Sequence, residues 1–391
     1  MQACVDAHRE LYNAALAERR DGYERVVRRS AEYFGPSRSK MPVRYGTQSD
    51  QLKDIRQVRP DLARWSFSSQ QATLRRLDKA FGAFFRRIRA GEKPGYPRFK
   101  AAHRFDSVEW PKDGDGCRWK PEVSRLYLQG VGDVKVTAHR KVEGIVKTVQ
   151  VRREGRRWML VLSCDDVPAR PLEATGRAVG VDVGIVTFAT TSDGEHVDNP
   201  RWGRAGADRL AAAQAVLARK KRGSNNRRKA RETVAARHRK TANQRRDFHH
   251  KTARHLADTY EVIAVEDLKI NNMTRRAKPR PDPDTPGGYL PNGQAAKSGL
   301  NRSIHDASWA AFVSILRAKA EEAGRTVIDV EPRHTSDRCE ACGHTEEANR
   351  VNQALFTCRR CAHHAHADEH AARNILRAGL ARLAAERPEA A

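Results

Sequence analysis

The stretch that decides the fold class is VGVDVGI, residues 179–185. Its apolar residues predict a buried β-strand, and Asp182 is the one charged residue within it. Working outward from this strand, we expect further strands over residues 186–191, 261–266 and 326–330, and a helix over residues 303–323. Strands that alternate with helices favour an α/β sheet that carries helices on its faces.

Two regions of different periodicity precede this sheet. The first has apolar side chains at helical spacing and predicts a helical lobe over residues 1–95. The second alternates with a period of two and contains a hairpin signal, so we expect a small antiparallel β-barrel over residues 96–170. The α/β region then covers residues 171–391. The predicted fold class is therefore multidomain, with α+β regions followed by an α/β domain.

The chain carries a large excess of positive charge. Its 391 residues include 74 Lys and Arg against 48 Asp and Glu, a formal net charge of +26. Hydrophobic residues make up 39%, enough to bury real cores, so disorder throughout the chain is disfavoured. No apolar run approaches the roughly 18 residues of a membrane span and no signal-peptide layout is present, so we expect a cytoplasmic protein without a membrane partner. Nucleic acid is the plainest partner, against the alternative of a merely basic soluble protein.

More than half of this excess lies in one helical region. Residues 201–254 contain eighteen Lys and Arg against three acids, a net +15, and a break near residues 223–226 predicts a helical hairpin. A solvated surface is the usual explanation of a charge run, but one-sided charge of this size favours binding to a phosphate backbone. The predicted contacts beside the break are Lys220, Lys221, Arg222, Arg227, Arg228 and Lys229.

A second basic segment, residues 93–100, combines positive charge with aromatic residues. Tyr96, Arg98 and Lys100 are its candidate nucleic-acid contacts. The pattern leaves two explanations open: a turn packed on the body of the protein, or a surface that stacks on bases and pairs with phosphates.

Four cysteines have the spacing of a zinc site. Cys339-x2-Cys342 and Cys358-x2-Cys361 are separated by fifteen residues. Four thiolates complete a tetrahedron and leave no open coordination position, so the Zn²⁺ is expected to be structural, in a ribbon over residues 333–365. Two disulfides are a poor alternative in a reducing cytosol. The neighbouring histidines are expected to be solvated or to contact phosphate: His344, His363, His364 and His366.

Three acids lie in segments that are expected to be buried. Asp182 interrupts an apolar strand, Glu266 ends another, and Asp368 lies on the helix expected after the ribbon. An unpaired carboxylate in such a place is costly and normally needs a cation, for which Mg²⁺ is the obvious hard ion. Two strand acids and one helix acid can converge on a two-metal site that flanks a scissile phosphate. For Asp182 alone, a buried and hydrogen-bonded carboxyl group is the alternative.

Taken together, these segments resemble the OrfB/TnpB family of transposon-encoded proteins, whose members are often called transposases. The resemblance extends from about Leu11 to Ala378, and its motifs are specific in combination. It rests on the ribbon and on GYPRFK (95–100), VGVDVGI (179–185), VEDL (265–268), LNRSI (300–304) and DxxAAxNI (368–375).

The resemblance implies an RNase H-like (RuvC) nuclease domain with an inserted zinc ribbon, as in the related type V CRISPR effectors. It further implies an RNA-guided DNA endonuclease that binds a guide RNA from the transposon end and cuts target DNA, with no obligate protein partner. Asp182, Glu266 and Asp368 would be its catalytic residues and would hold Mg²⁺ or Mn²⁺. The helical lobe would be the recognition lobe, the barrel would hold RNA and adjacent duplex, and the basic hairpin would follow the guide–target heteroduplex.

Two features depart from the family pattern. The pattern has a basic strand before the first helix, whereas this sequence starts in helix, so an exposed barrel edge is expected. It also has Asn where this chain has His370, which is either disruptive or harmless to the acidic site. These departures keep two alternatives open: a nuclease-inactive RNA-guided DNA-binding regulator, and a resolvase or transposase that needs no guide.

Overall fold

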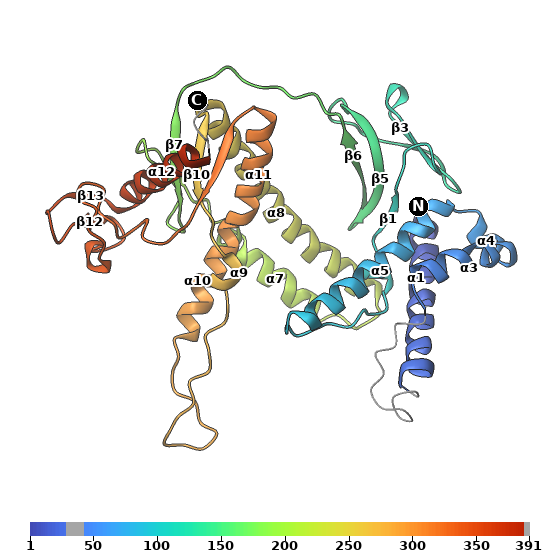
Figure 1. Cartoon of the computed structure of the whole chain (residues 1–391). Helices are drawn as coiled ribbons and strands as arrows, with labels where there is room; N and C mark the ends of the chain where they lie inside the picture. Colours follow the sequence, from blue (N-terminus) through green and yellow to red (C-terminus); the bar gives the residue numbers. More distant parts are fainter. Residues whose placement is uncertain (29–42, 387–391) are drawn as a thin grey trace. The chain divides into compact units, whose positions relative to one another are not determined.

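The computed structural model describes residues 1–28 and 43–386, and the chain divides into two compact units, Met1–Pro168 and Ala169–Ala391 (Figure 1). The parts of the predicted helical lobe at 29–42 and of the predicted C-terminal domain at 387–391 lie outside the described residues. Within the described ranges, none of the helices is both long and apolar enough to span a membrane.

Helices form the first part of the N-terminal unit. They are α1 (Gln2–Gly22) with a π-helical end (Tyr23–Arg28), α3 (Tyr45–Val58), α4 (Pro60–Ala63) and α5 (Phe67–Arg89). Helix α5 begins where the Ser66 hydroxyl accepts a hydrogen bond from the Ser69 amide (3.3 Å), a normal N-cap. Leu74, Leu77 and Phe81 lie on its buried face, as their spacing predicts.

The β-region of this unit is not a barrel. Its strands are β1 (Ser107–Trp110), β2 (Cys117–Lys120), β3 (Arg125–Leu128), β4 (Gly132–Lys135), β5 (Ile145–Glu154) and β6 (Arg157–Asp165). Among the described residues they form two open three-stranded antiparallel sheets, ordered β1-β5-β6 and β2-β3-β4. The predicted hairpin is present as β5 and β6, but the prediction of a barrel is wrong, because the two sheets are open.

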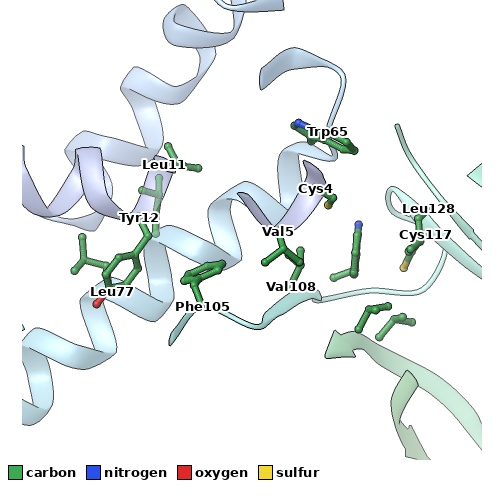
Figure 2. Close-up of a cluster of buried hydrophobic side chains, with 14 of the residues drawn as sticks. Cys4, Val5, Leu11, Tyr12, Trp65, Leu77, Phe105, Val108, Cys117 and Leu128 are labelled. Atoms are coloured by element: carbon green, nitrogen blue, oxygen red, sulfur yellow. The ribbon is translucent and has the colours of Figure 1, made fainter. Parts of the chain in front are cut away.

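The physical reason lies in what covers the sheets. Val108 and Trp110 on β1, with Val149 and Val151 on β5, join the same hydrophobic core as Val5 and Leu77 from the helices (Figure 2). The first sheet is therefore covered by helices rather than continued by further strands, and among the described residues β6 is an edge strand with no fully buried residue.

The C-terminal unit is built on one mixed five-stranded sheet of order β11-β10-β7-β8-β9. The strands are β7 (Ala178–Val183), β8 (Thr187–Thr191), β9 (His196–Asp198), β10 (Val262–Glu266) and β11 (Thr326–Val330). Strand β10 pairs in parallel with both β7 and β11, whereas β7, β8 and β9 are antiparallel. The strand predicted over 179–185 is present as β7, which ends at Val183 and is the middle strand of the sheet.

Long helices cover both faces of this sheet. Val179 and Val181 point to the core shared with α8 (Asn225–Thr259) and α11 (Trp309–Glu322). Because side chains alternate along a strand, Gly180 and Asp182 point to the other face, where α12 (Ala367–Glu386) packs. The remaining helices are α6 (Trp202–Ala205), α7 (Ala207–Ala218), α9 (Ile270–Met273) and α10 (Gln294–Ala307).

The helix predicted over 303–323 is two helices. Helix α10 begins earlier than expected and ends at Ala307, and α11 starts at Trp309. Between them Ser308 adopts a left-handed conformation (φ 58°), which breaks the helical path. The turn lets the Trp309 indole donate to the carbonyl oxygen of Gly184 on the loop after β7 (3.3 Å).

Candidate functional site

Helix α12 approaches the sheet very closely, and this contact positions the acidic residues. A methyl group on Gly180 would overlap the carbonyl oxygen of Ala372, and one on Gly379 would lie 2.6 Å from the Cβ of Ala264. Gly180 and Ala264 are neighbours in register on β7 and β10. Small residues on both sides therefore allow the helix to lie directly on these two strands.

The three predicted acids lie on this face. Asp182 and Glu266 follow Gly180 and Ala264 by two residues, so their side chains share the face that α12 covers. Asp368 lies in the first turn of α12, one helical turn before Ala372. The structure therefore places on one face three residues that are 84 and 102 positions apart in sequence.

Burial and neighbouring charge act on two of these acids. Burial raises the pKa of Asp182 to about 7, and the nearby negative charges of Glu266 and Asp368 act in the same direction. Burial also raises the pKa of Glu266, although a hydrogen bond from the Thr335 hydroxyl (2.6 Å) opposes this shift. Such a cluster, in which carboxylates destabilise one another's charged forms, is well suited to a cation.

An arginine that the sequence did not predict completes this cluster. Arg350 comes from the ribbon, and its guanidinium Nη2 donates to Asp368 Oδ1 at 2.8 Å. Its charge lowers the pKa values of Asp182 and Glu266, against the effect of burial. Nothing in the spacing of the sequence places Arg350 there, because its position depends on how the ribbon folds back onto α12.

Asn374 of the DxxAAxNI motif joins the ribbon to the acidic cluster. Its buried amide donates to the carbonyl oxygens of Thr335 (2.9 Å) and Arg338 (2.7 Å). The hydroxyl of the same Thr335 is the one that donates to Glu266. Asn374 thus fixes the chain segment that orients a carboxylate of the cluster, a role that the sequence alone did not assign.

The four cysteines form the predicted cluster. Cys339 Sγ lies 3.7 Å from Cys361 Sγ, and Cys342 Sγ lies 3.6 Å from Cys358 Sγ. Zn–S bonds of about 2.3 Å in a tetrahedron separate sulfur atoms by about 3.8 Å, so these residues fit a zinc ion. Strands β12 (Leu355–Thr357) and β13 (His364–His366) form the hairpin of the ribbon.

His370 faces the ribbon rather than the acids. Its ring stacks on Phe356 with 3.6 Å between centroids, and its Nε2 accepts a hydrogen bond from the Glu340 amide (3.2 Å). Burial lowers its pKa to about 4, so the ring is neutral near pH 7. Of the two explanations that the sequence left open, the contacts favour the harmless one, in which His370 packs the ribbon against α12.

The positive hairpin consists of α7, a turn and α8. Lys220, Lys221, Arg222, Arg228 and Lys229 are exposed at its tip, in the turn and the first turn of α8. Arg227 differs, because its guanidinium donates to the carbonyl oxygens of Leu217 and Lys220 (2.9 Å each) and closes the end of α7. Five of the six predicted contacts are thus exposed, although Arg228 pairs with Glu232 (3.2 Å), while Arg227 has a structural role.

The basic loop over 93–100 has features of both explanations. The Tyr96 ring packs edge-on against Phe81 and Phe84, and the backbone of Lys100 exchanges hydrogen bonds with the Asn13 side chain. Arg98 is exposed. The loop is therefore anchored to α1 and α5 while it presents Arg98 outward.

Comparison with known proteins gives two matching family models. Residues 148–277 match the OrfB_IS605 model, described as a probable transposase, and residues 309–375 match the model of the Cas12f1-like TNB domain. The second match covers α11, β11, the ribbon and the first half of α12.

Two relatives match over most of the chain. The "Putative RNA-guided DNA endonuclease InsQ" of Escherichia coli (strain K12) is 32% identical over 384 residues, which is 98% of this chain and 89% of that protein. A "Putative RNA-guided DNA endonuclease" of Streptomyces pristinaespiralis is 32% identical over 80% of this chain and 71% of its own length. Among solved structures, the Cas12f1 chain of a Cas12f1-sgRNA-target DNA complex has a similar fold, with a TM-score of 0.52 at 17% identity over 96% of this chain and 81% of that chain. The chain therefore belongs to the OrfB/TnpB family.

Proposed function

We propose that this protein is an RNA-guided DNA endonuclease that binds a guide RNA from the transposon end and hydrolyses phosphodiesters of the target DNA. The observation that carries this proposal is the convergence of Asp182, Glu266 and Asp368 on one face of the sheet, with the pKa of Asp182 raised to about 7. The relatives named as RNA-guided DNA endonucleases, which match most of the chain, support it.

In this proposal the three carboxylates hold Mg²⁺ or Mn²⁺. Their oxygen atoms are the donors that these hard ions prefer, and one guanidinium, that of Arg350, leaves the cluster with excess negative charge. When bound, divalent ions stabilise the charge that develops on the attacking and leaving oxygens of a phosphodiester. The chain itself contributes orientation: the Thr335 hydroxyl holds Glu266, and Arg350 holds Asp368.

The other parts of the molecule serve to hold nucleic acid. The exposed lysines and arginines at the tip of the α7–α8 hairpin follow the phosphate backbone of the guide–target heteroduplex, whose sequence is read by base pairing. Residues 1–95 act as the recognition lobe, and the β-region over 96–170 contacts RNA and adjacent duplex through the loop that presents Arg98. Residues 171–391 form the RuvC-like nuclease, with a structural Zn²⁺ in the ribbon over 333–365.

The test begins with the RNA. The full chain is purified, the RNA that accompanies it is sequenced, and plasmids carrying the matching target are treated with the complex and Mg²⁺. We expect a defined RNA and cleavage by the wild type. The same RNA should accompany Asp182→Ala, with cleavage reduced by about 10³-fold or more, because the site loses a metal ligand.

Asp267→Ala is the matched control. Asp267 is the next acid after Glu266, but it is exposed and paired with Lys269, so its removal should leave the cleavage rate within about twofold. Cleavage by Asp182→Ala at the wild-type rate would contradict the acidic site. Absence of a defined RNA would favour a resolvase, and RNA binding without cleavage by the wild type would favour a regulator.

A further inference from the structure

A third group of metal-ligating side chains lies outside both the ribbon cysteines and the acidic cluster. His196 begins β9, His366 ends β13 and Glu369 lies in the first turn of α12. One ligating atom from each side chain lies within 4.8 Å of the other two. His366 and Glu369 are close in sequence, whereas His196 comes from a distant strand and meets them through the fold.

The geometry of the group is that of a metal site in which the ligands already face one another. His196 Nε2 lies 3.0 Å from Glu369 Oε1, and the rings of His196 and His366 meet edge to face with centroids 5.0 Å apart. Two ligand atoms bound to one ion at about 2.1 Å in a tetrahedron are about 3.4 Å apart. Small side-chain movements would therefore bring the atoms to a common ion.

Supporting contacts orient two of the three ligands. The other ring nitrogen of His196, Nδ1, lies 3.3 Å from the hydroxyl of Thr190, which is buried at 2% exposure. Such a bond leaves Nε2 to face the proposed ion, and metal-bound histidines usually have a partner of this kind. The second oxygen of Glu369, Oε2, lies 3.7 Å from the Arg373 guanidinium, which leaves Oε1 to face His196.

We propose that His196, His366 and Glu369 bind a transition-metal ion of the zinc class, at a third metal site of this protein. Two imidazoles and one carboxylate are a known ligand set for Zn²⁺, whereas Mg²⁺ prefers oxygen ligands alone. Both histidines are exposed, so the ion can enter from solvent and water can complete its coordination. The proposal does not depend on the nuclease function, because it rests only on these side chains.

The location gives the ion a structural consequence. His366 and Glu369 flank Asp368 in sequence, and Asp182, Thr190 and His196 occupy one register row across β7, β8 and β9. With strands about 4.8 Å apart, His196 lies about 10 Å from Asp182 along this row. An ion there would tie the edge strand β9 to the ribbon and to the start of α12, and would thus fix the turn that carries Asp368.

The experiment is a zinc titration of the full chain. The protein is prepared with its ribbon zinc in place, which elemental analysis should report as about one Zn per chain, and excess Mg²⁺ is present to occupy the acidic cluster. Calorimetry with ZnCl₂ should then detect one further site in the wild type. His196→Ala should weaken this site at least tenfold, and Glu369→Gln, which keeps the size of the side chain but removes its negative charge, should do the same.

His364→Ala is the matched control, because His364 lies on the same strand as His366 but outside the three-residue group. It should bind the additional zinc as the wild type does. Added zinc should also raise the melting temperature of the wild type and of His364→Ala, but not that of His196→Ala. The proposal is overturned if the wild type binds no zinc beyond the ribbon equivalent, or if Glu369→Gln and His196→Ala bind it with wild-type affinity.

Discussion

The ribbon and the acidic cluster lie next to each other, yet they are organised in opposite ways. The ribbon ligands come in two local pairs, so two tight turns place all four sulfur atoms. The acids come from β7, β10 and α12, and they meet only because a parallel strand pair and a closely packed helix put them on one face. Local spacing therefore determines the first centre, and tertiary packing determines the second.

The two centres are nevertheless connected, because the ribbon supplies Arg350 to the acids. The residue before it, Asn349, is buried and bonds to the backbone of Asp337 (2.9 Å) and Arg359 (2.8 Å) inside the ribbon. Arg350 can therefore reach Asp368 only if the ribbon is folded. The acidic cluster is therefore expected to depend on the folded ribbon.

The largest effect is expected from Cys358→Ser. Loss of one thiolate should release the zinc and unfold the ribbon, because structural zinc supplies folding energy directly. Since the ribbon holds Arg350 and contacts His370, we expect cleavage to fall by at least 10²-fold along with the zinc content. Cys164→Ser, which changes a partly buried thiol outside the ribbon, should leave both unchanged. Full cleavage by a zinc-free Cys358→Ser protein would mean that the two centres are independent.

Asp182→Asn should stabilise the metal-free protein while it abolishes cleavage. The pKa of Asp182 is about 7 in the folded chain, above its ordinary value of 3.8, so its contribution to stability is fully present below pH 4 and is lost as the pH rises through 7. Asparagine cannot ionise, so the variant does not lose stability in this way as the pH rises. In Mg²⁺-free buffer at pH 8, with the ribbon zinc in place, we expect a gain of roughly 2 kcal/mol, which shrinks toward zero at pH 4.

Thermal melts of wild type and Asp182→Asn across this pH range provide the measurement. Added Mg²⁺ should reverse the order at pH 8, because only the wild type keeps all three carboxylates for the ion. If the difference in stability between the two proteins does not vary with pH, ionisation of Asp182 is not its cause.

Arg350→Ala should destabilise the protein that lacks Mg²⁺, and the change should be smaller than the gain expected from Asp182→Asn. Without the guanidinium, the carboxylates of the metal-free protein lose the countercharge that opposes their repulsion. We expect a loss of about 1–2 kcal/mol at pH 8 in Mg²⁺-free buffer with the ribbon zinc in place, which added Mg²⁺ should largely restore. Arg359→Ala is a control in the same ribbon, because that residue is exposed and only its backbone amide bonds to Asn349. Equal losses in the two variants would mean that the effect belongs to the ribbon and not to the charge.

The contrast between local spacing and tertiary packing explains which features could be predicted from the sequence. The cysteine spacing, the central strand and the charge run are local patterns, and each has its expected place in the structure. The barrel was wrong because a period of two reports strands but not the helices that cover them, as α1 and α5 do here. Arg350, Thr335 and the group of His196, His366 and Glu369 escaped prediction because each depends on a tertiary contact that no local pattern reports, such as Thr335 with Glu266 and His196 with Glu369.

The smallest effect tests the symmetry of the ribbon itself. In both knuckles the amide of the first cysteine donates to the carbonyl oxygen five residues later (2.8 Å), and the residue before that carbonyl has a positive φ: Gly343 at 74° and Ala362 at 57°. An alanine in this conformation costs about 1 kcal/mol relative to glycine. Ala362→Gly should therefore slow the loss of zinc to a chelator, by up to about fivefold if the full strain is relieved.

Gly343→Ala should speed the loss of zinc to a chelator by a similar factor. Space does not limit this substitution, because the nearest atom to the new methyl group would be the Arg338 side chain at 3.9 Å. Its effect would thus report backbone strain alone. Opposite and matching shifts in the rate of zinc loss would establish that the two knuckles are equivalent turns. Faster loss from Ala362→Gly would instead mean that its methyl group contributes packing that the first knuckle lacks.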